Sequence, residues 1–248
     1  MRRSQLLPVA LIGLLFVPVS AEETSLQAKL EALQFSKVLD LPLFPEGPSY
    51  DPHNDRYVFS GNNALSLIDR SGSLQILSEK PGGGGTHVLP DGSILVVGKF
   101  GLRRFYPDGR VALLADGAET GGGNDLTIGK RGEIYFSAPG RGIYRLTPGT
   151  QGKLSLVTSQ GANGLDVDPS GEWLYVAAGG IQRHQIHGFE DSLGDRELVC
   201  ELPEGEAGGD GCTFDQDGNF YTVHFRTGTV RVINVQAKQL VSTIPTSV

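Results

Sequence analysis

The sequence contains few of the residues on which sulfur or paired-imidazole metal sites depend. Its 248 residues include 2 cysteines, 5 histidines, 1 tryptophan and 1 methionine. The histidines show no H-x-x-x-H spacing and the cysteines no C-x-x-C spacing, which argues against the usual zinc sites. There is no G-x-S-x-G motif, and the glycine run at 82–85 lacks a following Lys-Ser or Lys-Thr pair. These absences argue against a serine nucleophile elbow and a phosphate-binding loop.

Basic residues are also in the minority. The chain has 21 Lys and Arg against 28 Asp and Glu, a formal net charge of −7. This balance gives no basic footprint for nucleic acid, and we expect no nucleic-acid partner. Ordinary solubility accounts for the acidity, so we expect a small-molecule partner and leave the oligomeric state open.

The sequence has one long apolar run, and it lies at the N-terminus. Arg2 and Arg3 precede an apolar stretch from Leu6 to Val19, which is short for a membrane span of about 20 residues. Small residues at 19–21 then match a signal-peptidase site. We predict a signal peptide over 1–21 and an exported chain, periplasmic or secreted, with no membrane contact after cleavage. An uncleaved anchor is the alternative. Residues 22–36 are predicted to be helical or irregular, with Ser25 as a helix cap.

Glycine and proline, by contrast, are plentiful, at 35 and 14 residues. They punctuate five similar segments, each consisting of a glycine-rich turn, a short apolar strand, an x-x-Gly turn and a second strand. These segments span 44–61, 82–98, 121–138, 161–178 and 208–224. Two further strand-like runs follow each of them. Four strands in a repeat of about 40 residues is typical of a β-propeller. We therefore predict an all-β propeller over 37–248.

One position opens each repeat just before its first strand. It is occupied by Glu46, Gly84, Asn124, Asn163 and Asp210, at spacings of 38, 40, 39 and 47 residues. The first strand of every propeller blade lines the central channel, so these positions should converge at one end of it. Carboxylate and amide oxygens suit Ca²⁺ best, with Mg²⁺ or Mn²⁺ as substitutes. Asn and Asp are also common turn residues, so the pattern alone leaves a metal site and a set of turn formers both open.

The two cysteines fall in different places of this layout. Cys200 is predicted on an outer strand and Cys212 on the innermost strand of the next repeat. Strands lie about 4.8 Å apart, whereas a disulfide needs Cα atoms within about 7 Å. We therefore do not expect a Cys200–Cys212 disulfide.

Several short motifs together resemble a known family. They are Glu46-Gly47-Pro48, Asn124-Asp125 before GEIYFSAP, Ala162-Asn163-Gly164-Leu165 before DPSGEWLYVA, and Gly209-Asp210-Gly211 before FDQDGNFYTV. In order and spacing they resemble the senescence-marker-protein, gluconolactonase and luciferin-regenerating-enzyme family, from about Leu41 to Pro245.

The resemblance implies a six-bladed propeller with one divalent cation, usually Ca²⁺. It implies that Glu46, Asn163 and Asp210 are metal ligands and that Asn124 is a further ligand or orients the substrate. Asp210 is also implied as the catalytic general base or nucleophile. The implied reaction is hydrolysis of a small ester, a lactone above all.

The chain departs from this family pattern in two places. In the second repeat Gly84 offers no ligand. His87, a few residues further on, is only a minor candidate for that role. The five repeats also leave the sixth blade largely missing, so we expect the last blade of the ring to be incomplete. Residues 35–44 are predicted to supply the outer strand of that blade. A non-catalytic or truncated binding propeller is therefore one alternative, and a phosphotriester hydrolase on the same site is another.

Overall fold

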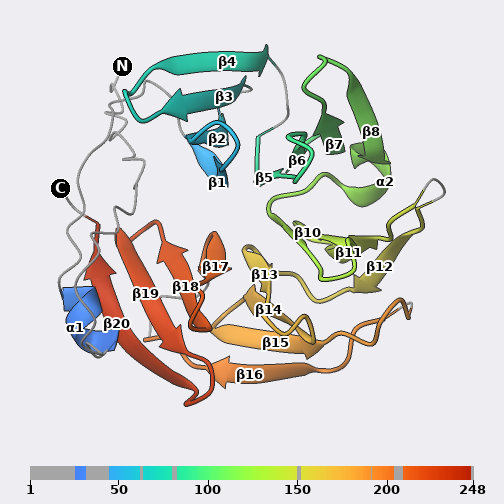
Figure 1. The fold of residues 1–248 in the computed structure, drawn as a ribbon. Coiled ribbons are helices and arrows are strands. Elements are labelled where there is room, and N and C mark those ends of the chain that lie inside the picture. The colour runs from blue at the N-terminus through green and yellow to red at the C-terminus, as the bar shows by residue number, and fades with distance from the viewer. Residues whose placement is uncertain are drawn as a thin grey trace, which may run out of the picture.

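The computed structural model describes residues 26–31, 45–61, 64–79, 83–149, 152–190, 192–203 and 209–246. These residues form five four-stranded antiparallel sheets arranged as blades around a central axis (Figure 1). Within each blade the strands follow one another in chain order from the innermost to the outermost. The protein is a five-bladed β-propeller with almost no helix, so the predicted all-β class is confirmed.

The blades have these bounds. Blade 1 contains β1 (Glu46–Asp51), β2 (Arg56–Gly61), β3 (Ala64–Asp69) and β4 (Leu74–Glu79). Blade 2 contains β5 (Thr86–Val88), β6 (Ile94–Gly98), β7 (Gly101–Phe105) and β8 (Val111–Asp116). Blade 3 contains β9 (Leu126–Ile128), β10 (Ile134–Ala138), β11 (Gly142–Leu146) and β12 (Leu154–Thr158). Blade 4 contains β13 (Leu165–Val167), β14 (Trp173–Ala177), β15 (Ile181–Gln185) and β16 (Arg196–Cys200). Blade 5 contains β17 (Cys212–Phe214), β18 (Asn219–His224), β19 (Thr229–Asn234) and β20 (Gln239–Pro245).

The hydrophobic core is divided into layers between neighbouring blades. Val58 of blade 1 packs with Val96 of blade 2, and Val97 of blade 2 packs with Phe136 of blade 3. The apolar runs of the second and third strands are buried because these strands pack against the neighbouring blades. Tyr135 packs against blade 4 in the same way. A fourth layer joins blades 4 and 5 through Tyr175, Ala177, Phe220 and Ile233.

The expectation of an incomplete last blade is wrong. Residues 239–245 form β20, which completes blade 5, and the described residues contain no strand of a further blade. The five repeats of the sequence correspond to the five blades, whereas the sixth was inferred from the family resemblance. The strand predicted at 35–44 lies outside the described residues.

A short helix covers one face of the last blade. Helix α1 (Leu26–Glu31) lies within the segment predicted to be helical or irregular. The helix lies beside β20 (Figure 1), and its Leu30 is buried against Val232 and Ile244 of blade 5. In blades 1 to 4 the corresponding face is covered by the next blade, so α1 takes that place on blade 5. The predicted signal peptide lies outside the described residues.

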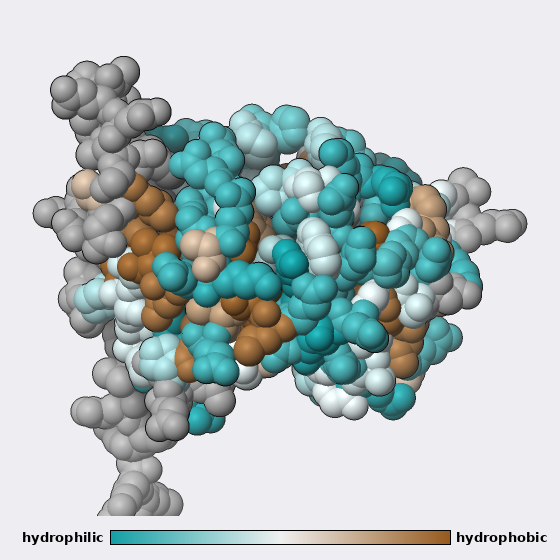
Figure 2. Space-filling view, turned by 90° about the horizontal axis from the view of Figure 1, so that it is seen from below, coloured by the Kyte–Doolittle hydropathy of each residue, from teal (hydrophilic) through white to brown (hydrophobic). Residues whose placement is uncertain are grey.

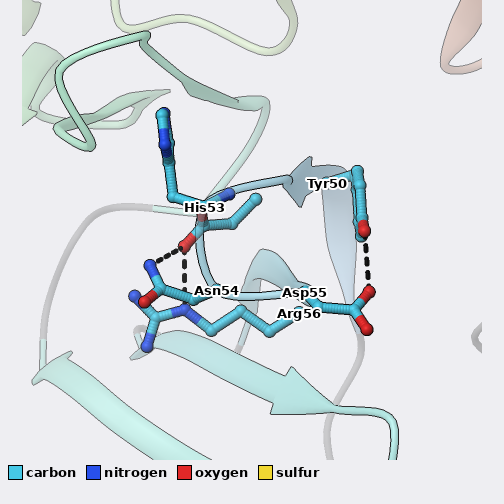
Figure 3. A network of polar contacts seen from close by, with 6 residues as sticks. Tyr50, His53, Asn54, Asp55 and Arg56 are labelled. Carbon is cyan, nitrogen blue, oxygen red and sulfur yellow. Dashed lines mark hydrogen bonds and ion pairs between the residues drawn. The ribbon is translucent and has the colours of Figure 1, made fainter.

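Aspartates hold the turns at the end of the propeller where the first strands finish. Asp51 accepts hydrogen bonds from Asn54 Nδ2 and Arg56 Nε, both at 2.8 Å (Figure 3). Asp55 of the same turn accepts a hydrogen bond from the Tyr50 hydroxyl at 2.7 Å. Other turns at this end use aspartate in the same manner, with Asp91, Asp168 and Asp215 accepting main-chain N–H groups. We call this the far end, because the candidate site lies at the opposite end.

The cysteines lie on the predicted strands. Cys200 is on β16 and Cys212 on β17, and both thiols are free. No helix among the described residues has the length and apolarity to cross a bilayer. Seen edge-on, the surface is mainly hydrophilic with separate apolar patches (Figure 2).

Candidate functional site

The predicted opening positions lie at the same level of their blades, at the start of the innermost strands or just before them. The main-chain N–H of Asn124 donates to Ser137 O, that of Asn163 to Ala177 O, and that of Asp210 to Val223 O. These contacts are equivalent, because each acceptor belongs to the second strand of the same blade. Glu46 starts β1 and pairs with Ser60 of β2. The repeated first strand therefore brings these positions to one end of the channel.

Glu46 and Asp210, which are far apart in sequence, lie close enough to influence each other. Burial raises the pKa of Glu46, and the negative charge of Asp210 raises it further. Burial also raises the pKa of Asp210. Hydrogen bonds from the Asn163 side chain and the Gly211 N–H, and the electrostatic effect of His224, act in the opposite direction and lower it in part. Two half-buried carboxylates thus carry adjacent negative charge that a bound cation would neutralise.

Asn163 gives the clearest structural indication of a ligand. Its side chain hydrogen-bonds to the Asp210 carboxylate. Its Oδ1 atom is buried and has no hydrogen-bond partner among the described residues. A buried carbonyl oxygen without a partner is unfavourable by about 1–3 kcal/mol, so such atoms call for an explanation. An oxygen-preferring cation held between Asn163, Glu46 and Asp210 would supply the missing partner, and these residues fit such a group.

Blade 2 contributes no ligand to this group for a steric reason. Gly84 has φ +125°, and a Cβ atom there would overlap Val97 O and the main-chain oxygen of Asn124. The position therefore excludes every side chain. His87 pairs with Leu95 in the middle of β5, below the level of the opening positions, and burial lowers its pKa. The structure does not place it with Glu46 and Asp210.

Asn124 is positioned mainly through its backbone. Its carbonyl oxygen accepts the Gly85 N–H at 2.6 Å, and its own N–H donates to Ser137 O at 2.8 Å. The side chain is half-buried on the blade next to Asn163. Among the described residues, no three His, Cys, Asp or Glu side chains are grouped to hold a metal. A site here would combine two carboxylates with amide oxygens.

Two half-buried aspartates behind the site, Asp125 and Asp166, were not singled out from the sequence. Asp125 accepts the N–H of Leu126 at 2.9 Å and, across the blade boundary, that of Leu165 at 3.2 Å. Asp166 accepts Thr127 Oγ1 of blade 3 at 2.6 Å and Phe214 N–H of blade 5 at 3.0 Å. These carboxylates join the innermost strands of neighbouring blades. Aspartate within a short apolar strand, as in LDV, is the signal that could have found Asp166.

Asp125 should make stability depend on pH. Burial raises its pKa to about 7, and Asp166 and Asp210 add to the increase. The folded state therefore holds a proton that the unfolded chain releases near pH 4. The contribution of Asp125 to stability is complete below pH 4 and is lost as the pH rises through about 7, by up to about 1.4 kcal/mol per pH unit. Urea unfolding should show that Asp125→Asn has a lower free energy of unfolding than wild type at pH 4.5. This difference should become smaller as the pH is raised to 8. An equal difference at every pH would contradict this.

A serine at the end of the second strand holds the next blade's opening position. Ser137 Oγ donates to Asn163 O at 2.7 Å and accepts the Asp125 N–H at 3.1 Å. Ser60 at the corresponding place in blade 1 makes both of its hydrogen bonds to Gly84 of the next blade, donating to its carbonyl at 2.5 Å and accepting its N–H at 2.8 Å. Ser60 also pairs with Glu46, but through its main chain, which a substitution by alanine keeps. The Ser60 side chain bonds only to Gly84, whereas the Ser137 side chain bonds to the candidate ligand Asn163.

This difference allows a matched test. Ser137→Ala and Ser60→Ala should each lower the free energy of unfolding by roughly 1–2 kcal/mol, because each leaves buried main-chain groups without a partner. Calcium affinity should fall only in Ser137→Ala, since Asn163 is then held less firmly. Calorimetric calcium titration of both variants measures this. Equal affinities in the two variants would show that Ser137 does not position the site.

Known proteins resemble this chain in sequence pattern and in fold. Residues 44–248 match the family model described as the SMP-30/gluconolactonase/LRE-like region. A gluconolactonase from Xanthomonas campestris superimposes with a TM-score of 0.71 at 21% identity, covering 82% of this chain and 76% of that chain. Regucalcin, a calcium-binding protein from Agrobacterium tumefaciens, gives 0.70 at 18% identity, covering 82% and 74%. A luciferin-regenerating enzyme gives 0.66 at 16% identity, covering 81% and 76%.

No curated protein sequence matches the chain. The solved structures share the fold, while the family model covers the region from just before β1 to the end of blade 5 and beyond. That region includes Glu46, Asn124, Asn163 and Asp210. The chain therefore belongs to the SMP-30/gluconolactonase/LRE-like family.

Proposed function

We propose that this protein is a calcium-dependent hydrolase of small esters, with lactones as its main substrates. The observation that carries the proposal is the buried, unpartnered Oδ1 of Asn163 beside the Glu46–Asp210 carboxylate pair. Family membership and the similarity to a gluconolactonase and a calcium-binding regucalcin support it.

The donor set suits calcium, with magnesium or manganese as substitutes. Glu46 and Asp210 provide charged oxygens, and Asn163 and Asn124 provide neutral ones. A dication bound there would polarise the ester carbonyl and stabilise the oxyanion that forms. Asn163 holds the Asp210 carboxylate in one orientation through its side-chain hydrogen bond.

In this proposal Asp210 acts as a general base and Asn124 orients the substrate. Asp210 takes a proton from a water molecule while the water oxygen bonds to the carbonyl carbon. The bond between that carbon and the ring oxygen then breaks, and the proton returns to the leaving alkoxide. The product is a hydroxy acid, one water heavier than the lactone. We also propose that the reaction takes place after export, in the periplasm or outside the cell, because residues 1–21 resemble a signal peptide.

Metal removal tests the proposal directly. Protein dialysed against a chelator should lose hydrolysis of D-glucono-1,4-lactone, and calcium should restore it in a saturable manner. Magnesium and manganese should restore it less well, because the mixed carboxylate–amide set favours a larger cation. Ser60→Ala serves as the control, since the side chain that it removes bonds only to Gly84, which offers no ligand. Full hydrolysis in the presence of chelator would rule out a metal-dependent reaction. No hydrolysis under any condition would favour a binding propeller.

A further inference from the structure

His224 lies beside Asp210 in the sheet of blade 5. It is the last residue of β18, which pairs with β17 through Thr222 and Cys212. The Asp210 N–H donates to Val223 O at 2.6 Å, so the next residue of β18 reaches the height of Asp210. In Figure 1 β17 lies next to β13, the innermost strand of blade 4. The pairing of β17 with β18 therefore carries an imidazole to the level of the candidate catalytic carboxylate.

His224 and the Asp210 carboxylate both face blade 4. Successive side chains of a strand alternate between its two faces, so His224 lies on the same face as Phe220. Phe220 packs in the hydrophobic layer between blades 4 and 5. The Asp210 carboxylate accepts a hydrogen bond from the Asn163 side chain of blade 4, and His224 is close enough to influence its pKa. Both groups thus occupy the site end of the space between these two blades.

One nitrogen of the His224 imidazole is fixed by the protein and the other is left for a ligand. His224 is 4% exposed, and its Nδ1 lies 2.8 Å from Thr227 Oγ1 in the turn after β18. Thr227 Oγ1 also lies 2.9 Å from Thr229 Oγ1, to which it can donate. On that basis we assign the imidazole proton to Nδ1, which donates to Thr227 Oγ1 and leaves Nε2 as an acceptor. Within the described part of the chain Nε2 makes no hydrogen bond.

A second buried histidine shows how a purely structural imidazole is held in this protein. His184 on β15 is 1% exposed, and both of its nitrogens are used. Its Nδ1 bonds to Gly194 O at 2.9 Å, and its Nε2 accepts Arg196 Nε at 3.2 Å. The other three histidines lie on a far-end turn, in the middle of β5 and on the connection between β15 and β16. Only His224 therefore combines burial, an unused nitrogen and a place next to a candidate ligand.

An acceptor beside a general base can orient the water that the base deprotonates. We propose that His224 is a catalytic residue of this hydrolase, whose Nε2 accepts a hydrogen bond from one proton of the attacking water while Asp210 takes the other. The water oxygen bonds to the carbonyl carbon, the bond from that carbon to the ring oxygen breaks, and Asp210 gives its proton to the leaving alkoxide. His224 neither gains nor loses a proton. This inference rests on the proposed hydrolase function.

Water and methanol as competing nucleophiles test this role. Methanol has a single O–H, which Asp210 would take, so it has no second proton to donate to Nε2. His224→Phe keeps a planar ring and removes both nitrogens. In saturating calcium it should hydrolyse D-glucono-1,4-lactone with a kcat about 30-fold below wild type, and with KM and calcium affinity within about twofold. Methanolysis of the same lactone to its methyl ester, measured by NMR in the same samples, should fall by less than about threefold.

Three further variants separate this role from a structural one. His224→Gln has an amide oxygen that can accept in place of Nε2, so it should recover hydrolysis to within about fivefold of wild type. Thr227→Val removes the partner of Nδ1 and should lower the ratio of hydrolysis to methanolysis in the same direction by a smaller factor. His184→Phe replaces an equally buried imidazole away from the site and should leave the ratio unchanged.

An equal fall of hydrolysis and methanolysis in His224→Phe, or unchanged hydrolysis, would overturn the inference while leaving lactone hydrolysis intact. If that variant does not fold, Thr227→Val decides, because a lowered ratio supports the inference and an unchanged ratio overturns it. If methanol does not react with wild type, recovery of kcat by His224→Gln decides in the same way. Wild type that hydrolyses no lactone in calcium would contradict the proposed function, and this inference with it.

Discussion

Asp210→Asn is expected to lower calcium-dependent hydrolysis by about 10³-fold or more without unfolding the protein. Loss of a general base alone costs 10²–10⁴-fold, and the variant also loses a charged ligand. Lactone hydrolysis in saturating calcium, with circular dichroism as the check on folding, measures this. A variant that keeps a tenth of wild-type activity would show that Asp210 is not the catalytic carboxylate.

The same substitution should leave the calcium-free protein as stable as wild type or more stable. Asp210 has a raised pKa because it is half-buried, and its charge raises the pKa of Glu46. Their contribution to stability is therefore present at acid pH and lost as the pH rises through the raised values. At neutral pH the asparagine removes this repulsion. Calcium at 100 times its Kd should stabilise wild type by about 2.7 kcal/mol and the variant by much less. A strongly destabilised calcium-free variant would indicate a structural role.

Asp166→Ala is expected to have the largest effect on stability, roughly 3 kcal/mol or more. Its two oxygens accept hydrogen bonds from blades 3 and 5 and from its own Val167 N–H. Removing them leaves buried donors of three strands without a partner, at about 1–3 kcal/mol each, offset by relief of the buried charge. Urea unfolding measures the change.

Thr127→Val is the matched control for Asp166→Ala. It removes one of the same hydrogen bonds and keeps the others, so it should cost only about 1 kcal/mol. A loss of less than 1 kcal/mol in Asp166→Ala would contradict the account that carboxylates join the blades. Equal losses in the two variants would place the whole effect in the Thr127 hydrogen bond.

The repeat allowed much of the fold to be predicted, because turn glycines and apolar strands recur at a readable spacing. It placed Asn163 and Asp210 just before innermost strands, as the structure has them, while Glu46 is the first residue of its strand. The number of blades was predicted wrongly because the sixth came from the family resemblance and not from a repeat in this chain. Blade 5 shows why that mattered, since Leu30 of α1 packs where another blade was expected.

Contacts between blades could not be predicted from the sequence. Ser137 and Ser60 hold the next blade's opening position only because neighbouring sheets stack at a particular height and twist. The same holds for the hydrogen bond from Leu165 N–H to Asp125. Gly84 was recognised as a departure from the pattern, but the reason for it, the nearby main-chain oxygens, is visible only in the structure.

The most direct test of the account combines calcium calorimetry with lactone hydrolysis on the same samples of wild type and Asp210→Asn. The account predicts one calcium site per wild-type chain, activity that follows its occupancy, and loss of both in the variant. Wild-type protein that binds no divalent cation, or that hydrolyses lactone equally with the site empty, would contradict it.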